Sequence, residues 1–110
     1  MTANNLKHLC KLLTRLGYEC HTAAVSVRSP LHGVQYRHQL TVRSQNEPPA
    51  GKSRASITLY LMAWGGVRIE SVYARLPALG FPADADPYRV VAKLLDKLDE
   101  DERYRRAIGD

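Results

Sequence analysis

Apolar residues recur every three or four positions near the start of the chain, which is the spacing of an amphipathic helix. These positions are Leu6, Leu9, Leu13 and Leu16. Gly17 follows as a residue that readily ends a helix, so the pattern predicts a helix over residues 6–16. Its opposite side carries a row of three cations at four-residue spacing, Lys7, Lys11 and Arg15. Such a row is usually a solvated face.

Two later stretches alternate apolar and polar residues with the two-residue period of β-strands. In residues 23–28 the apolar positions are Ala23, Val25 and Val27. In residues 34–43 they are Val34, Tyr36, His38, Leu40 and Val42. Pro30 and Gly33 favour a reversal between the two stretches, so we expect a hairpin with one apolar and one polar face.

The sequence Val-Arg-Ser recurs at the ends of these two stretches, at residues 27–29 and 42–44. The alternation predicts that each copy points its Val inward and its Arg outward, with Ser beginning the following turn or loop. The same alternation places His38 on the apolar face, where we expect a hydrogen-bonded and partly buried residue.

A second hairpin is predicted over residues 56–76. Two prolines and a glycine make the preceding residues 45–55 a surface loop. Residues 56–64 are rich in β-branched and aromatic side chains, and Gly65 and Gly66 separate them from a further strand. Residues 56–64 are apolar on both faces, which fits either a central strand covered on both sides or a strand that carries a binding surface.

The chain is predicted to end in a second helix, after a Pro- and Gly-rich connection at residues 77–87. Asp86 is a good N-cap, and Pro87 suits the first helical position. The expected buried stripe of this helix consists of Val91, Leu94, Leu95 and Leu98. The acidic run at residues 99–102 is interpreted as its solvated side.

This order of elements predicts an α+β fold, with an N-terminal helix, a four-stranded antiparallel sheet made of two hairpins, and a C-terminal helix. Both helices are expected to pack on one face of the sheet. With 110 residues, the chain is predicted to form a single domain over residues 1–110.

The composition is that of an ordinary globular domain, with 45% hydrophobic and 25% charged residues. No apolar run is long enough to span a bilayer, and the first residues lack the layout of a secretory signal. We therefore expect a cytoplasmic protein that does not enter a membrane. Cys10 and Cys20 are too few for a disulfide framework, and free, partly buried thiols are expected.

The positive charge is concentrated in the first three-quarters of the chain. Residues 1–82 contain ten Lys and Arg against three acids, and residues 83–110 contain six against eight, so the net charge of +5 is the sum of +7 and −2. A basic surface of this kind is typical of nucleic-acid contact, although arginines on an exposed strand face also keep a sheet soluble.

Sequence motifs for catalysis, nucleotides or metals are weak. The Gly-Lys-Ser at residues 51–53 lacks the earlier glycine of a phosphate-binding loop. His8, Cys10, Cys20 and His21 have metal-binding side chains, but helix and strand geometry point them in different directions. The acids of residues 1–82 are widely spaced, and no nucleophile lies beside a base. We expect no enzymatic activity, no cofactor and no metal.

The basic residues and two aromatic residues define the candidate nucleic-acid site. Cations that meet phosphates and rings on which bases stack are the requirements for binding single strands. The candidate site consists of Arg28, Arg37, Arg43, Lys52, Arg54, Tyr60, Trp64 and Arg68. A two-residue turn at Gly65 and Gly66 would instead place Tyr60 and Trp64 in the core or in a dimer interface.

Two functions follow as hypotheses. The first is a small accessory protein that binds single-stranded DNA or RNA electrostatically, with a homodimer formed through the sheet. The second is a protein-interaction or inhibitor module, of the kind that phages and other mobile elements carry, which binds a partner protein through Tyr60, Met62 and Trp64 or through the acidic helix.

Overall fold

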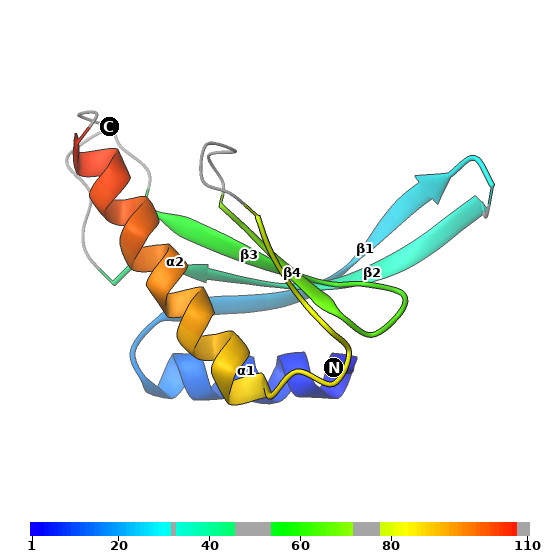
Figure 1. Ribbon diagram of the computed structural model, residues 1–110, viewed down its shortest axis with the longest axis horizontal. Coiled ribbons are helices and arrows are strands. Elements are labelled where there is room, and N and C mark those ends of the chain that lie inside the picture. The colour runs from blue at the N-terminus through cyan, green and yellow to red at the C-terminus, as the bar shows by residue number, and fades with distance from the viewer. Residues whose placement is uncertain (32, 46–53, 72–77, 108–110) are drawn as a thin grey trace.

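The structure is a computed structural model that describes residues 1–31, 33–45, 54–71 and 78–107. Along the chain its elements are α1 (Ala3–Arg15), β1 (Glu19–Ser29), β2 (Gly33–Arg43), β3 (Ser56–Leu61), β4 (Val67–Ser71), β5 (Leu79–Phe81) and α2 (Pro87–Ala107). The strands form one antiparallel sheet in chain order (Figure 1). The predicted α+β fold is confirmed, and β5 adds a short fifth strand where the sequence indicated only a connection.

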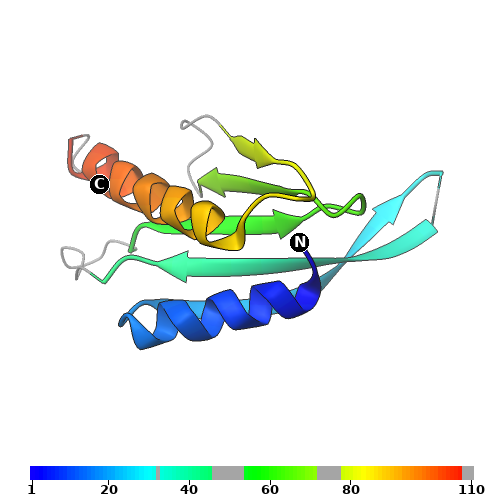
Figure 2. The same cartoon turned by 60° about the horizontal axis from the view of Figure 1, so that its bottom comes forward.

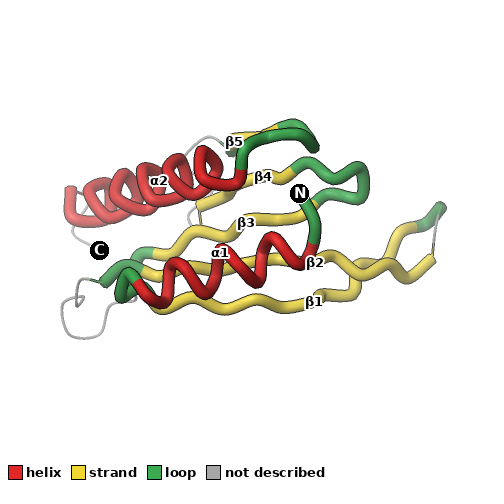
Figure 3. Tube along the Cα trace, turned by 90° about the horizontal axis from the view of Figure 1, so that it is seen from below, coloured by secondary structure: helices red, strands yellow, loops and turns green. Residues whose placement is uncertain are grey.

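Both helices lie on one face of the sheet, as predicted. α1 covers β1 and β2, and α2 covers β3 and β4 (Figure 2, Figure 3). Their apolar sides meet the inward residues of the sheet in one continuous core, with Leu13, Leu40 and Ile57 fully buried. Removing this apolar surface from water is the main force that holds the helices on the sheet. No helix in the described part of the chain has the length and apolar character needed to span a membrane.

Local sequence explains where the helices begin and end. Thr2 caps α1, because its Oγ1 accepts a hydrogen bond from the Asn5 N–H while Asn5 Oδ1 accepts one from the Thr2 N–H at 2.7 Å. Gly17 follows α1 with φ 94°, a conformation that suits glycine. Asp86 Oδ1 accepts from the Tyr88 N–H at 3.0 Å, and Pro87 is the first residue of α2, as predicted.

The first hairpin has a different register from the one that the alternation predicted. Ser29 pairs with Gly33, and the connection at residues 30–32 fixes all the pairs that follow. Val25 therefore lies opposite Arg37 and is 36% exposed. Arg28 lies opposite Val34, on the face that bears Val42. The prediction that both Val-Arg-Ser copies point Arg outward is wrong for the first copy, because a one-residue shift in register exchanges the two faces of a strand.

Two other predicted positions also differ. His38 is exposed rather than partly buried. One end of the hairpin of β1 and β2 extends beyond the helices (Figure 1). The acidic run of α2 is only partly solvated, because Asp101 is 0% exposed and accepts a hydrogen bond from Ser71 Oγ at 2.7 Å. Glu102 Oε1 accepts from Ser44 Oγ at 3.0 Å. These two acids therefore attach the far end of α2 to the sheet.

Candidate functional site

The face of the sheet opposite the helices, called the open face below, is not covered by any described element (Figure 1). Its strand register places polar side chains from three strands side by side. Arg37, Gln39, Thr41 and Arg43 come from β2, Thr58 and Tyr60 from β3, and Arg68 and Glu70 from β4. The alternation of β2 predicted its polar residues on this face, whereas the face of Tyr60 was left open; the register places Tyr60 here rather than in the core.

Tyr60 is already in contact with a cation of its own chain. The Arg37 guanidinium lies 4.3 Å from the centroid of the Tyr60 ring, and both side chains are half-buried. This cation–π contact occupies a ring face on which a base would stack. Arg37, predicted to bind phosphate, therefore contacts Tyr60, predicted to stack on a base.

The other two cations of the open face have acidic partners. Arg68 Nε lies 2.7 Å from Glu70 Oε1, and Arg43 Nη1 lies 3.8 Å from Glu19 Oε1. The pKa of Glu19 is lowered, first by its hydrogen bond with His21 and further by the charges of Arg43, His21 and Arg54. Glu19 therefore stays ionised among these cations and offsets part of their charge.

Of the remaining candidate residues, Arg54 acts on Glu19 beside this group and Trp64 borders Arg68, whereas Arg28 and Lys52 are not part of it. Arg28 is exposed on the opposite face near the end of β1, and Lys52 lies outside the described residues, as does the Gly-Lys-Ser motif. Arg54 is half-buried just before β3. Trp64 lies in the turn after β3 and is 63% exposed, with its ring directly on the Gly66 backbone, where any side chain would overlap it.

Trp64 borders a shallow hollow at one end of the open face. The hollow has a volume of about 300 Å³ and is lined by Met62, Trp64, Val67, Arg68, Ala78 and Gly80. The turn responsible for this placement is longer than two residues, because Leu61 pairs with Val67. Trp64 and Met62 are therefore available for contact with another molecule.

The outer side of β1 is a second candidate surface, called the β1 edge below. β1 pairs with β2 alone among the described strands, so one side of its backbone has no strand partner. Residues 21–26 are all exposed, and residues 20–27 contain no Lys, Arg, Asp, Glu or Pro. Proteins usually protect such edges with charges, prolines or bulges. Six exposed residues present roughly 20 Å of unprotected strand.

The flank of α1 lies beside this edge. A hollow of about 510 Å³ between the two is lined by Lys7, Cys10, Lys11, Thr14, Arg15 and Thr22. Lys7, Lys11 and Arg15, called the basic row below, are exposed and form no salt bridge with any described residue. The helical spacing predicted the row, but only the strand order shows that it borders an edge.

Beneath the basic row, Cys10 and Cys20 join α1 to β1. Both thiols are free and half-buried, as predicted. Burial raises the pKa of Cys20, and contact with Cys10 raises it further, so this thiol is a poor nucleophile. The two histidines of the candidate metal set lie elsewhere. His21 bonds with Glu19 on the open face at 3.3 Å, and His8 borders a different groove.

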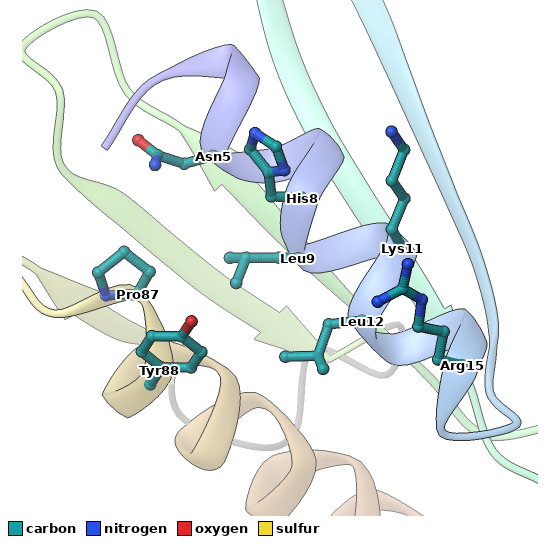
Figure 4. A pocket seen from close by; sticks show the side chains of 8 residues that line it. All are labelled: Asn5, His8, Leu9, Lys11, Leu12, Arg15, Pro87 and Tyr88. Carbon is teal, nitrogen blue, oxygen red and sulfur yellow. The ribbon is translucent and has the colours of Figure 1, made fainter.

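That groove separates α1 from the first turn of α2. It has a volume of about 480 Å³, and Leu9 and Leu12 point across it toward Pro87 and Tyr88 (Figure 4). Lys11 and Arg15 extend from the other side of α1 (Figure 4). The groove offers apolar contacts and His8, but the described residues gather no group of three or more metal-binding side chains here or elsewhere.

Comparison of the chain with protein-family models, curated proteins and solved structures gives no match. The function is therefore inferred from the geometry of these surfaces.

Proposed function

We propose that this protein works by binding a partner protein, and that it takes an extended segment of that partner as an added strand on the β1 edge. In this mode the main-chain groups of the segment pair with those of the edge, and alternate side chains provide specificity. The β1 edge carries the proposal, because six consecutive exposed residues contain no Lys, Arg, Asp, Glu or Pro and pair with β2 without a bulge.

The chemical groups of the molecule support binding rather than catalysis. The Cys20 thiol has a raised pKa and faces Cys10, and His21 lies on the opposite face of the sheet, bonded to Glu19. Asp101 is buried and hydrogen-bonded to Ser71. These groups serve the packing of the fold and do not converge on one cavity.

Proline substitutions on the β1 edge test this function. Ala23 and Ala24 are neighbours on a strand, so the N–H of one points toward β2 and that of the other points outward. Proline is tolerated on an edge strand only where the lost N–H faces solvent. One of Ala23→Pro and Ala24→Pro should therefore keep the melting temperature and lose binding of a labelled Thr-Val alternating peptide, measured by fluorescence anisotropy. Undiminished binding in both variants would contradict the proposal.

A second candidate function is electrostatic binding of single-stranded DNA or RNA on the open face. The Arg37 and Tyr60 pair on this uncovered surface favours it, with Trp64 nearby. Each phosphate neutralised on a single strand should contribute about −0.7 to the log-log salt slope. Anisotropy of labelled oligonucleotides at two salt concentrations, with Arg37→Glu/Arg43→Glu, measures this directly. Binding that ignores salt, or that survives the double substitution, would exclude the open face as the site.

A further inference from the structure

We infer that the segment bound at the β1 edge is acidic at every second residue, with its carboxylates directed at the basic row of α1. This inference rests on the proposed function and specifies the chemistry of the partner. It combines two features that lie side by side, a strand edge without charges or prolines and a row of cations that form no salt bridge with the described residues.

An added strand would place half of its side chains beneath the flank of α1. Side chains of a strand alternate between the two faces of the sheet, and an added strand continues the faces of β1. One set would therefore lie on the helix side, next to the hollow that Lys7, Lys11 and Thr22 line. The other set would lie beside Ala23 and Val25 on the open face. The two environments predict carboxylates on the first set and small apolar groups on the second.

The basic row forms no salt bridge with any described acid, and most of the described acids have partners elsewhere. In α2, Asp99 pairs with Arg103 at 2.6 Å and Glu100 with Lys97 at 3.6 Å. Asp101 and Glu102 bind Ser71 and Ser44. Glu19 and Glu70 pair with arginines of the open face. Lys7, Lys11 and Arg15 retain their positive charge at the mouth of the hollow.

A second copy of this chain fits the same edge poorly. Two antiparallel β1 strands related by a two-fold axis keep both α1 helices on the same side of the joined sheet. Because α1 lies over β1 and β2, its flank would face the same flank of the other copy (Figure 3). Lys7 and Lys11 of each copy would then oppose like charges, which is unfavourable.

A nucleic acid satisfies only one of the two features. Its phosphates suit the basic row, but a sugar–phosphate chain lacks the alternating N–H and C=O groups that pair with a strand edge. A peptide with acidic residues at alternate positions satisfies both. The hydrogen-bonding pattern of the edge therefore favours a polypeptide partner.

The experiment compares three labelled peptides of equal length that alternate Val with Glu, Thr or Lys, using fluorescence anisotropy at low salt. The Glu-Val peptide should bind at least about tenfold more tightly than the Thr-Val peptide, and the Lys-Val peptide should bind least, because surface ion pairs contribute up to about 1 kcal/mol each. Lys7→Glu/Lys11→Glu should reverse the order. Arg89→Glu/Lys93→Glu, a matched double change at exposed positions of α2, should leave it unchanged.

Two N-methylated forms of the Glu-Val peptide test whether it binds as a strand. Methyl groups on alternate amides remove the donors that face the β1 edge in one form and the donors that face solvent in the other. One form should bind as the parent does, and the other should lose about tenfold or more. Equal binding of both forms would mean that charge alone holds the peptide, and it would overturn the inference.

The outcomes separate this inference from the proposed function. Equal affinity for the Glu-Val and Thr-Val peptides would overturn the acidic preference and leave strand addition intact. Binding of none of the three peptides would overturn both. A homodimer seen in sedimentation and abolished by Ala23→Pro or Ala24→Pro would mean that a second copy occupies the edge. Binding of an oligonucleotide that depends on Lys7 and Lys11, with no binding of the peptides, would mean that the partner is a nucleic acid. Either result would overturn the inference.

Discussion

The cations of the open face and those of the basic row differ in the partners that the fold gives them. On the open face, Arg37 lies over Tyr60 and Arg68 contacts Glu70. Along α1, Lys7 and Lys11 are exposed beside a strand edge and form no salt bridge with the described residues. Both groups belong to the basic first part of the chain. A cation that already has a partner must exchange it to bind a ligand, whereas one without a partner only gives up water.

Net charge is therefore a poor guide to where this molecule binds. The sequence directed attention to the arginines of the sheet, because they alternate with apolar residues. The lysines of α1 look like an ordinary solvated helix face, which is what such rows usually are. Their position beside the β1 edge distinguishes them, and that position depends on the order of strands in the sheet. Substituting the acids and the cations themselves tests this difference between the two groups.

The largest expected effect is on the free energy of unfolding, and it comes from the buried acid Asp101. Asp101→Ala removes the acceptor of the Ser71 hydrogen bond and leaves Arg105, which is 6% exposed, near a lost charge. We expect the free energy of unfolding to fall by about 2 to 3 kcal/mol, because a buried polar group that loses its hydrogen-bond partner is costly. Urea denaturation measures it, with Asp99→Ala as the control on the exposed side of α2. A loss under about 1 kcal/mol would mean that Asp101 does not attach α2 to the sheet.

The next effect concerns the open face. Glu19→Gln/Glu70→Gln removes the carboxylates beside Arg43 and Arg68. If these acids keep Arg43 and Arg68 from binding phosphates, affinity for single-stranded DNA should rise about tenfold at low salt. The log-log salt slope should steepen by about 1.4, which corresponds to two more phosphate contacts. Asp99→Asn/Glu100→Gln changes the net charge equally on α2 and is the matched control. An equal rise in the control would assign the effect to net charge instead of partner loss.

Asp101 should also make the stability of the fold depend on pH, which is a smaller effect. Burial raises the pKa of Asp101, and the Ser71 hydrogen bond, Arg105 and a bond with the Ser56 backbone oppose this only in part. The folded chain therefore holds this proton to higher pH than the unfolded chain. The corresponding stability is complete below the unfolded value of about 3.9 and is lost as the pH rises through the folded pKa.

The variant Asp101→Asn isolates this contribution. Its free energy of unfolding, minus that of the unsubstituted protein, should rise with pH from about 4 and then level off once the carboxyl has ionised. Urea denaturation at several pH values gives this difference, in which the opposite contribution of Glu19, whose pKa is lowered, cancels. A difference that does not change with pH would mean that Asp101 has the same pKa in both states.

Local pattern was enough to predict most of the fold, and long-range pairing accounts for what it missed. The N-cap at Asp86, the stop at Gly17 and the inward residues of β2 follow from spacing of a few positions. The faces of β1 depend on the connection at residues 30–32, which sets a register that the alternation alone leaves open. β5 is only three residues long, Leu79–Phe81, and its pattern is too short to distinguish it from a loop.

The difference between local pattern and long-range pairing also explains which parts of the candidate site could be predicted. Strand alternation predicted that Arg37 and Arg43 share a face, and it left the face of Tyr60 open between this surface and the core. Their partners were not predictable, because Glu19 reaches Arg43 across a strand pair whose register was unknown. The β1 edge was missed for a similar reason. A strand becomes an edge only through the order of the whole sheet, and the sole sequence signal was the absence of charge from residue 20 to residue 27.

The smallest expected effect gives the clearest contrast between the two groups of cations. Lys7→Glu/Lys11→Glu should change the free energy of unfolding by no more than about 0.5 kcal/mol, since neither lysine has an acidic partner in the described chain. Arg43→Glu/Arg68→Glu should cost more, about 1 to 2 kcal/mol in total, because each new carboxylate faces Glu19 or Glu70. Urea denaturation of both variants at low salt gives the comparison. Equal costs would mean that the basic row stabilises the fold itself, and its cations would then not be free to bind an acidic segment.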